Sequence, residues 1–570
     1  MRWRSYTQRH IFVETVAIQD LLLVRGLHEW LKEVIHEVPT IHTSKFNLAI
    51  PFAAILLLGF ALRLNGIDWG LPNALHPDYS YHPDEWLGLF LAELLAQGEM
   101  RPMHFMYGGA FYFSTVESIY SIGSLITDFW GGTIARNTIL LGRGLGVVYG
   151  LLSITLTYLI ANMLFDRKTA LLAALMMALY PGQIFWAQRV RPDELFAFLF
   201  ALNCFVMARI YKGRGNIYRN IAIGGLLFGL SVATRFPAVA LYAGYVVAIL
   251  LSAHKGRIPL KSILVSRPHW LLIAFTLVGY IAASPYSLMY FRVLVDGIQM
   301  QLTFQSSPFA DAIGRGPGWY QYGGRMLSQA MGYPLYALAL GAVALAAWKR
   351  SREEVLLFAM FVPYFISLSL ASWVVVRYTL PLLPILAIFS SRLVFSMAAT
   401  RERRVALAGV LGAAMLWTSA ANLAYANAIK GEDARDTAAI WIKQNVKSGA
   451  RIGAFIDYVG DKFKTPPPER MHRWAYFSLR EEGLDEFLGH QLDYLVINDR
   501  FIREGKRLGN LHPYPEVARL QQWTEKHPGY KLVAEFSREV MVAGMNFGYQ
   551  FTSNDYMLAR PRIYIFQRLE

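Results

Sequence analysis

Long apolar runs alternate with short polar, often basic, segments over the first three quarters of the chain. A helix that crosses a bilayer needs roughly 20 predominantly apolar residues. Runs of about this length lie at 46–64, 139–163, 169–188, 194–211, 270–290, 332–348, 355–376, 379–397 and 405–427. The stretch 220–252 is long enough for two short helices, with Arg235, Phe236 and Pro237 at the turn between them. The pattern predicts a polytopic α-helical membrane protein.

Basic residues between these runs predict the topology. They cluster at 167–168, 209–219, 255–261, 349–352 and 401–404. Since loops rich in Lys and Arg stay in the cytoplasm, we place all five clusters there, which requires a hairpin at 220–252. It also requires that the run 107–128, which contains Glu117 and Asp128, does not cross. We expect about eleven spanning helices, an N-terminus inside and a C-terminus outside, and 107–128 as a membrane-embedded or juxtamembrane segment.

The pattern divides the chain into three parts. In residues 1–45 leucines recur at helical spacing, which predicts either an amphipathic helix on the cytoplasmic membrane surface or an ordinary cytosolic packing helix. Residues 46–427 form the transmembrane part. In residues 428–570 a helix over 433–446 precedes strand-like segments at 450–455, 492–499, 531–538 and 562–568. This part predicts a small extracytoplasmic α/β domain.

Composition agrees with a membrane protein. The 570 residues are 55% hydrophobic and 17% charged, whereas soluble domains carry about 45–50% and about 25%. These values exclude a disordered, collagen-like or disulfide-rich chain. The net charge of +15 lies in the clusters between apolar runs, so it indicates topology and not a nucleic-acid partner. The lone Cys204 lies in an apolar run, which excludes an intrachain disulfide and a cysteine-based metal site.

The first outer loop concentrates ionisable residues. The segment HPDYSYHPDEW contains His76, His82, Asp84 and Glu85. Pro83 suits a helix start, where acidic side chains favour the helix dipole, so a purely structural role is one interpretation. The second outer loop, QRVRPDE, repeats the Pro-Asp-Glu pattern at Asp193. Together the two loops could place two carboxylates around one cavity, where one acts as a general base towards a hydroxyl.

Arginines near the same membrane face have two interpretations. Arg377-Tyr378 begins an apolar run, and Arg235 lies at the turn of the predicted hairpin. Long basic side chains commonly extend from a span to the interface. Alternatively, these arginines and Arg191 bind an anionic group at that depth.

These motifs, in order, resemble the membrane-embedded glycosyltransferases of the GT-C class. The likeness is greatest to the family that includes dolichyl-phosphate-mannose protein mannosyltransferases and the aminoarabinose transferase of lipid A. It rests on the acidic pair Asp84-Glu85 and on YGGAFYF (107–113), 135–181, QRVRPDELFAF (188–198), LLFGLSVATRFPA (226–238) and RYTLPLLPILAI (377–388). It covers about 47 to 397, and the tail resembles the outer domain of such enzymes. Family members often have His-Pro-Pro where this chain has Tyr-Gly-Gly at 107–109, so the resemblance does not assign an acceptor or carrier contact to this segment.

The resemblance implies a polyprenyl-phosphate-linked sugar as donor and a protein, glycolipid or polysaccharide hydroxyl as acceptor. It makes Asp84 the base, Glu85 its support or a donor contact, and Asp193 a second acidic residue of the site. It places Arg377 and Tyr378 near the donor phosphate, and Arg191 and Arg235 are further candidates.

We expect a single displacement with inversion at the outer face of a plasma (inner) membrane. The sequence does not decide whether a divalent metal ion takes part. The candidate ligands for such an ion are Asp84, Asp193, His76 and His82. Other GT-C reactions, such as polymer ligation or oligosaccharide transfer, are one alternative. A transporter or lipid flippase is another, and a structural scaffold is a third. Transporters tend to place charges at mid-membrane in repeated halves, which this sequence does not show.

Overall fold

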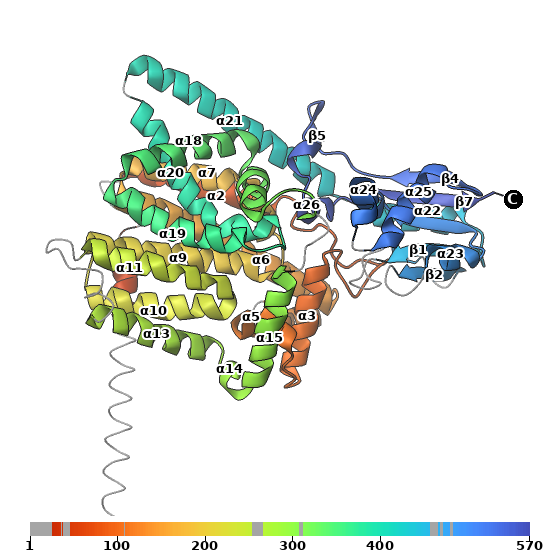
Figure 1. Ribbon diagram of the computed structural model, residues 1–570, viewed down its shortest axis with the longest axis horizontal. Coiled ribbons are helices and arrows are strands. Elements are labelled where there is room, and N and C mark those ends of the chain that lie inside the picture. Colours follow the sequence, from red (N-terminus) through yellow and green to blue (C-terminus); the bar gives the residue numbers. More distant parts are fainter. Residues whose placement is uncertain are drawn as a thin grey trace, which may run out of the picture.

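The computed structural model describes residues 26–35, 37, 46–107, 109–252, 266–306, 312–398, 400–456, 465–467, 471–478, 483–512 and 514–569. Figure 1 shows a bundle of helices and, beyond one end of it, a smaller region that contains a sheet. The basic cluster 255–261 and most of 1–45 lie outside the described residues.

Each apolar run of the sequence contains at least one helix. The bundle helices are α2 (Phe46–Leu64), α6 (Ile134–Leu164), α7 (Arg167–Leu179), α8 (Pro181–Ala187), α9 (Pro192–Lys212), α10 (Ile217–Thr234), η1 (Phe236–Ala240), α11 (Leu241–Ser252), α13 (Arg267–Ala283), α18 (Tyr333–Lys349), α19 (Arg352–Ser369), η4 (Val376–Leu382), α20 (Leu383–Met397) and α21 (Arg401–Ile429). Glycines let α10 and α13 approach closely, because a Cβ on Gly229 would lie 2.1 Å from the Thr276 carbonyl oxygen. Small residues at helix crossings are typical of membrane bundles.

Not every bundle helix is long enough to span a bilayer by itself. Within the described residues, five segments are long and apolar enough: Ile134–Leu164, Pro192–Lys212, Ile217–Thr234, Val376–Met397 and Arg401–Asn445. The pair α7 and α8, bent by 59°, adds a sixth if it forms one span. The polytopic helical fold is therefore confirmed, whereas the expected count of about eleven spans is not.

Eight further helices gather where the bundle meets the C-terminal region. They are α3 (Pro83–Ala96), α4 (Pro102–Tyr107), α5 (Gly109–Trp130), α14 (Tyr286–Met289), α15 (Phe291–Ser306), α16 (Gly318–Tyr320), η3 (Gln321–Met326) and α17 (Leu327–Met331). In Figure 1, α3 and α15 run across the direction of the bundle helices at this end. The helix α5 covers most of 107–128, packs against α3 and α6, and is not among the five candidate spans.

The helix over 26–35 lies at the other end of the bundle. Trp30 is buried and donates a hydrogen bond from its ring nitrogen to the Asn220 side chain at 3.1 Å. Arg209 pairs with Glu33 and Glu37, each at 2.7 Å. Leu27, Leu31 and Ile35 share the opposite side and are exposed. One face of this helix therefore packs on the bundle, and the other presents apolar side chains.

A mixed sheet forms the core of the C-terminal region. Its strands are β1 (Arg451–Ile456), β2 (Arg473–Ser478), β3 (Tyr494–Asn498), β4 (Tyr530–Phe536) and β7 (Ile563–Arg568), in the order β2-β1-β3-β7-β4. The strand β1 is parallel to β2 and β3, and β7 is antiparallel to β3 and β4. The separate hairpin of β5 (Met541–Val542) and β6 (Met545–Asn546) forms a second sheet. The predicted α/β character and four of the strands are confirmed, whereas β2 was not predicted.

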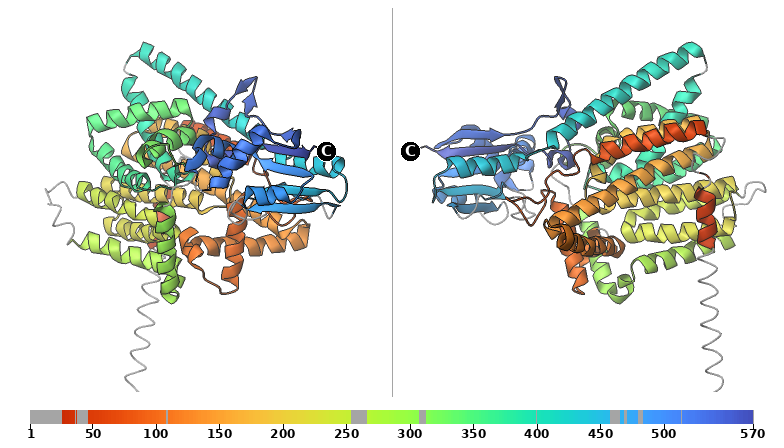
Figure 2. Two further views of the ribbon diagram at one scale, coloured as in Figure 1. Left: turned by 45° about the vertical axis from the view of Figure 1, so that its right-hand side comes forward. Right: turned by 180° about the vertical axis from the view of Figure 1, so that it is seen from behind.

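Helices cover both faces of this sheet. The remaining elements are α22 (Ala434–Asn445), α23 (Leu484–Gly489), α24 (Asp499–Leu508), η7 (Gly509–Leu511), α25 (Pro515–Lys526), η8 (Gly548–Gln550) and α26 (Asn554–Met557). Ala438 and Ile442 of α22 pack on Ile452, Val496 and Ile565. A second cluster joins α23, α24 and α25 to the sheet. Figure 2 shows from two further sides that this region continues directly from α21.

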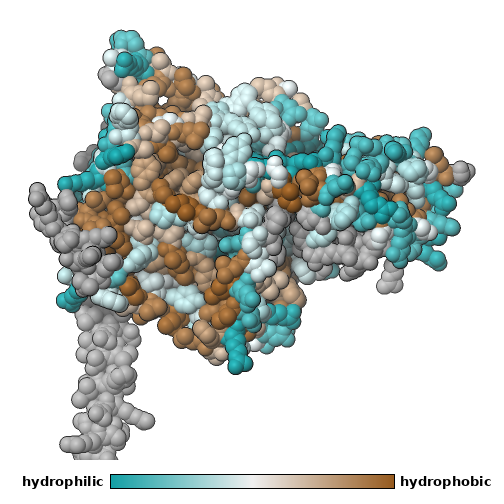
Figure 3. Space-filling view, in the orientation of Figure 1, coloured by the Kyte–Doolittle hydropathy of each residue, from teal (hydrophilic) through white to brown (hydrophobic). Residues whose placement is uncertain are grey.

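The surface separates into apolar and polar parts. Figure 3 shows apolar residues over much of the bundle, and hydrophilic residues over the C-terminal region and at the start of α21. The turns between α6 and α7, α9 and α10, and α18 and α19 lie at the end of the bundle away from the C-terminal region (Figure 1). These turns carry three of the basic clusters.

We expect the two ends of the bundle to face opposite sides of the membrane. In intact cells, a membrane-impermeant thiol reagent should label Leu511→Cys, which is exposed in the C-terminal region. It should label Arg214→Cys, in the exposed turn after α9, only after permeabilisation. The parent protein controls for Cys204, which is buried. Labelling of the two variants in the reverse order would overturn the expected orientation.

Candidate active site

Asp84 lies at the start of α3, where the first outer loop meets the bundle. His82 precedes the helix, and Pro83 occupies its first position. The local pattern thus forms a helix start, as the structural interpretation of the sequence also predicts. The Asp84 side chain is 23% exposed and forms an ion pair with Arg191. This acid is accessible from outside the protein while paired on one side.

Asp193 occupies the same position at the start of α9 and is nearly fully buried. It accepts a hydrogen bond from Arg191 Nε at 2.8 Å and another from Arg235 at 2.7 Å. Arg235 follows the last residue of α10, so the turn before η1 brings it to the same point. The Nε atom of Arg377 lies 4.0 Å from Asp193 Oδ2, the same oxygen that accepts the hydrogen bond from Arg191. Three arginines from three separate segments of the chain, Arg191, Arg235 and Arg377, therefore lie around Asp193.

Arg377 also reaches a residue of the C-terminal region. It forms an ion pair with Asp555 of α26 at 2.6 Å, and Asp555 accepts a second hydrogen bond from the Val376 backbone at 2.7 Å. Burial raises the pKa of Asp555, although the Arg377 charge opposes this effect. The guanidinium lies over the ring faces of Trp186 and Tyr378, at 5.4 and 5.5 Å from their centres. Such cation–π contacts hold an arginine without neutralising it.

The network described above contains three carboxylates and three guanidinium groups. Asp84, Asp193 and Asp555 are each paired with at least one of Arg191, Arg235 and Arg377. Buried charges are tolerated when they are paired in this way. The structure thus brings together two of the three predicted catalytic residues and the predicted arginines.

A cavity opens beside this network. Asp193, Arg235, Arg377 and Tyr378 line one part of it. Apolar side chains from α4, α9, η1 and α19 form much of the rest: Phe105, Met106, Phe196, Phe236, Pro237 and Leu368. The chemistry of this lining, a few convergent charges against apolar walls, matches that of a ligand with an anionic head and an apolar tail.

Glu85, the third predicted catalytic residue, points elsewhere. Its carboxylate is fully buried and accepts two hydrogen bonds from Arg143 of α6, at 2.9 and 2.7 Å. Ser80 and the Val190 backbone donate two more, at 2.7 and 2.9 Å. Burial by itself raises the pKa of Glu85, but the charge and hydrogen bonds of Arg143, together with other nearby positive groups, outweigh burial and lower the pKa to about 2. Glu85 therefore joins α3, α6 and the loop before α9, and it is not a cavity residue.

The predicted metal ligands do not gather at one point. His76 lies against Asp436 of α22, with 3.6 Å between its Nε2 and the carboxylate. His82 packs against Trp186, and burial lowers its pKa to about 3, so this imidazole is neutral. In the part of the chain that the structure describes, no three His, Cys, Asp or Glu side chains could hold a metal ion. These residues do not fit a shared metal site.

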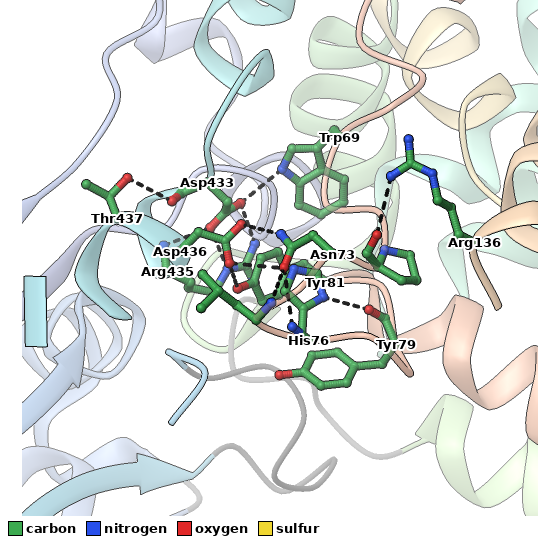
Figure 4. A network of polar contacts seen from close by, with 12 residues as sticks. Trp69, Asn73, His76, Tyr79, Tyr81, Arg136, Asp433, Arg435, Asp436 and Thr437 are labelled. Carbon is green, nitrogen blue, oxygen red and sulfur yellow. Dashed lines mark hydrogen bonds and ion pairs between the residues drawn. The ribbon is translucent and has the colours of Figure 1, made fainter. Parts of the chain in front are cut away.

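The loop before Asp84 is held by the C-terminal region (Figure 4). Asp436 accepts hydrogen bonds from Tyr81 at 2.5 Å and from Asn73 at 2.9 Å. Asp433 accepts one from the Trp69 ring nitrogen at 3.1 Å and also pairs with Arg435. Arg435 in turn lies over the Tyr81 ring, 3.8 Å from its centre. The first turn of α22 thereby fixes the loop that ends at Asp84.

Several of these residues were not predicted from the sequence. Asp555 and Asp436 lie in a region whose pattern predicted only a small domain, and Arg143 lies inside an apolar run. A charge within a run that otherwise spans the membrane is the one available signal, and it marks Arg143.

A family model described as dolichyl-phosphate-mannose-protein mannosyltransferase matches residues 131–287. The predicted resemblance to this GT-C family is confirmed. The matched segment contains Arg143, Arg191, Asp193 and Arg235, whereas Asp84, Arg377 and Asp555 lie outside it. A comparison with curated protein sequences finds no significant match.

Solved GT-C structures are similar at low identity. The apo oligosaccharyltransferase of Archaeoglobus fulgidus has 13% identity and a TM-score of 0.47, and the alignment covers 84% of this chain and 73% of that chain. ArnT from Cupriavidus metallidurans bound to undecaprenyl phosphate has 12% identity and a TM-score of 0.48, over 90% of this chain and 97% of that chain. Since these TM-scores are low, the family match and the site geometry carry the functional conclusion.

Removing Arg143 should destabilise the fold strongly. Arg143→Ala leaves Glu85 buried without its cation, which costs about 3–5 kcal/mol for a buried pair. Thermal unfolding in detergent should show a clear drop in Tm. The double variant Glu85→Leu/Arg143→Met removes both charges and should recover much of the loss. Equal damage in the single and double variants would contradict the pairing.

The same pair predicts a pH dependence. The lowered pKa of Glu85 stabilises the fold above its ordinary value of 4.5, and this contribution is lost as the pH falls towards about 2. The Tm of the parent protein should therefore fall over that interval. Glu85→Gln should have a lower Tm at neutral pH and a flatter profile, and an unchanged slope would assign the effect to other groups.

Proposed function

We propose that this protein is an integral-membrane glycosyltransferase. It moves a sugar from a polyprenyl-phosphate donor to an acceptor hydroxyl at the outer face of the plasma membrane. The observation that carries the proposal is the meeting of Asp84, Asp193 and three arginines beside a cavity with apolar walls. The description of the matched family names a polyprenyl-phosphate sugar, which agrees with this geometry.

The arginines provide the phosphate subsite. Arg235 and Arg377 line the cavity, and Tyr378 lies between them, with its ring 5.4 and 5.5 Å from the two guanidinium carbons. Guanidinium groups suit phosphate because their donors match its oxygens. The prenyl tail then lies along the apolar wall formed by Phe105, Phe236 and neighbouring residues.

Asp84 is the general base of the proposed reaction. Its partial exposure lets an acceptor hydroxyl approach, whereas Asp193 is enclosed by its arginines. The acceptor oxygen forms a bond to the anomeric carbon while its proton passes to the Asp84 carboxylate. The bond from that carbon to the phosphate oxygen breaks, and the electron pair leaves with the polyprenyl phosphate. Cations that already surround the phosphate stabilise the departing charge.

Asp193 and Asp555 have supporting roles in this scheme. Asp193 orients Arg191, which contacts the base, and Arg235, which lines the phosphate subsite. Asp555 is paired with Arg377, so a phosphate that binds there competes with a carboxylate. Glu85 acts indirectly, because it fixes the start of α3 through Arg143.

Asp84→Asn should abolish transfer and leave folding nearly unchanged. Purified protein is given a panel of radiolabelled polyprenyl-phosphate sugars, with host membrane extract as the source of acceptors. The labelled product identifies the sugar and whether the acceptor is a protein, glycolipid or polysaccharide. Asp78→Asn is the matched control, because Asp78 is an exposed carboxylate of the same loop. Full activity of Asp84→Asn would contradict the assignment of Asp84 as the general base.

If the parent protein consumes none of the donors, this result would contradict the proposed transferase activity. A reconstituted lipid-flipping assay then tests the transporter alternative.

Loss of either subsite arginine should weaken use of the donor. Arg377→Gln or Arg235→Gln removes a charged hydrogen bond to phosphate, which corresponds to about a 10- to 100-fold loss in kcat/KM. We expect most of this loss to appear as a higher KM for the donor. The Lys variants should recover part of the lost kcat/KM. Arg403→Gln, exposed at the other end of the bundle, controls for net charge. Unchanged kinetics with the donor would contradict the proposed position of the phosphate at this end of the cavity.

A further inference from the structure

After β4 the chain leaves the main sheet and forms the hairpin 540–549. The strands β5 and β6 pair through Met541 with Asn546 and Val542 with Met545. In the views of Figures 1 and 2, the hairpin projects upwards beside the end of α21, away from the rest of the C-terminal region. Contacts between β5 and α21 agree with this placement.

The tip of the hairpin is apolar and exposed. No charged residue occurs between Val540 and Gln550. Met541 and Met545 are 40% and 46% exposed, although methionine side chains gain by leaving water.

The turn residues strengthen this point. Ala543 and Gly544 both have positive φ, 48° and 77°. A two-residue turn of this kind favours Asn-Gly or Asp-Gly in water, and a left-handed alanine costs about 1–2 kcal/mol. The hairpin therefore keeps a strained apolar residue where a polar one is the ordinary choice.

The base of the hairpin packs on the membrane helices. Phe547 is buried against Trp417 of α21, with ring centres 5.1 Å apart. Tyr549 stacks on Tyr333, which begins α18, at 5.9 Å. Trp417, Tyr333 and Tyr549 are themselves exposed. Exposed Trp and Tyr residues are typical of the boundary between a bilayer and water.

The position of Trp417 along α21 indicates how deep the base of the hairpin lies in the bilayer. The basic turn at 401–404 starts this helix, and Trp417 lies 13 residues beyond Arg404. At 1.5 Å per residue this is about 20 Å, within a hydrocarbon core about 30 Å thick. In Figure 1, α21 is tilted relative to the other bundle helices, so its advance across the bilayer is smaller still. The base of the hairpin therefore lies at the level of the bilayer.

We propose that the hairpin 540–549 inserts its tip into the outer leaflet of the bilayer. The partner is the lipid bilayer, which is continuous with the exposed apolar face of α21. Met541, Ala543 and Met545 contact lipid, and the three aromatic residues lie around them. This contact attaches the C-terminal region to the membrane independently of the transferase reaction.

Fluorescence quenching in lipid nanodiscs tests the insertion. The full-length Met545→Cys protein, in a Cys204→Ala background, carries an environment-sensitive fluorophore. We expect strong quenching by lipids with a nitroxide near the headgroup and several-fold weaker quenching by iodide than at Leu511→Cys. Leu511 is 72% exposed in the same region and is the matched aqueous control. Quenching at Met545 that equals the Leu511 pattern would overturn the proposal.

Two further variants separate lipid contact from other causes of protection. Adding Met541→Asp to the labelled protein should raise iodide quenching towards the Leu511 value. Ala543→Gly relieves the strain without adding polarity and should leave the lipid quenching unchanged. Protection of the label from both quenchers would mean that a protein or a second copy covers the hairpin, and it would also reject the bilayer as partner.

Discussion

Pairing of buried charges is the constraint on which this structure depends. Asp193 is surrounded by guanidinium groups, and Glu85 is surrounded by donors from three segments. Moving either carboxylate from water into such a place is costly unless cations and hydrogen bonds compensate. The helices α3, α6, α9 and α10 must therefore keep one mutual arrangement, because each contributes a member of these pairs. Packing of apolar faces alone would tolerate several arrangements.

The two carboxylates that follow Pro in each outer loop show how one local pattern serves different ends. Asp84 and Glu85 are adjacent on α3, yet one faces outwards and the other inwards. Their surroundings decide this difference, since Arg143 lies on the buried side. A helix start predicts that acids are favourable there, but it does not predict which of them becomes accessible.

The sequence predicted the helical runs, the α/β character of the tail and the residues near the cavity from periodicity and charge. It could not predict how many helices span, because η1 with α11, and α18, are apolar but short. It also placed Glu85 and the histidines in the site, since side-chain direction and partners depend on tertiary contacts. Asp555 and Asp436 were missed for the same reason. Each acts on a residue far away in sequence, and no local pattern records such a pairing.

The pairing of Arg377 with Asp555 has a consequence for biosynthesis. The two residues are separated by 178 positions, and the arginine belongs to the earlier, membrane-embedded part. A chain made from its N-terminus thus places Arg377 in the bilayer before its carboxylate partner has been synthesised. Until the C-terminal region folds and docks, that cation lacks this partner and is an unstable point of the nascent bundle. Docking of the last-made region is therefore also the step that completes the charge balance of the first-made one.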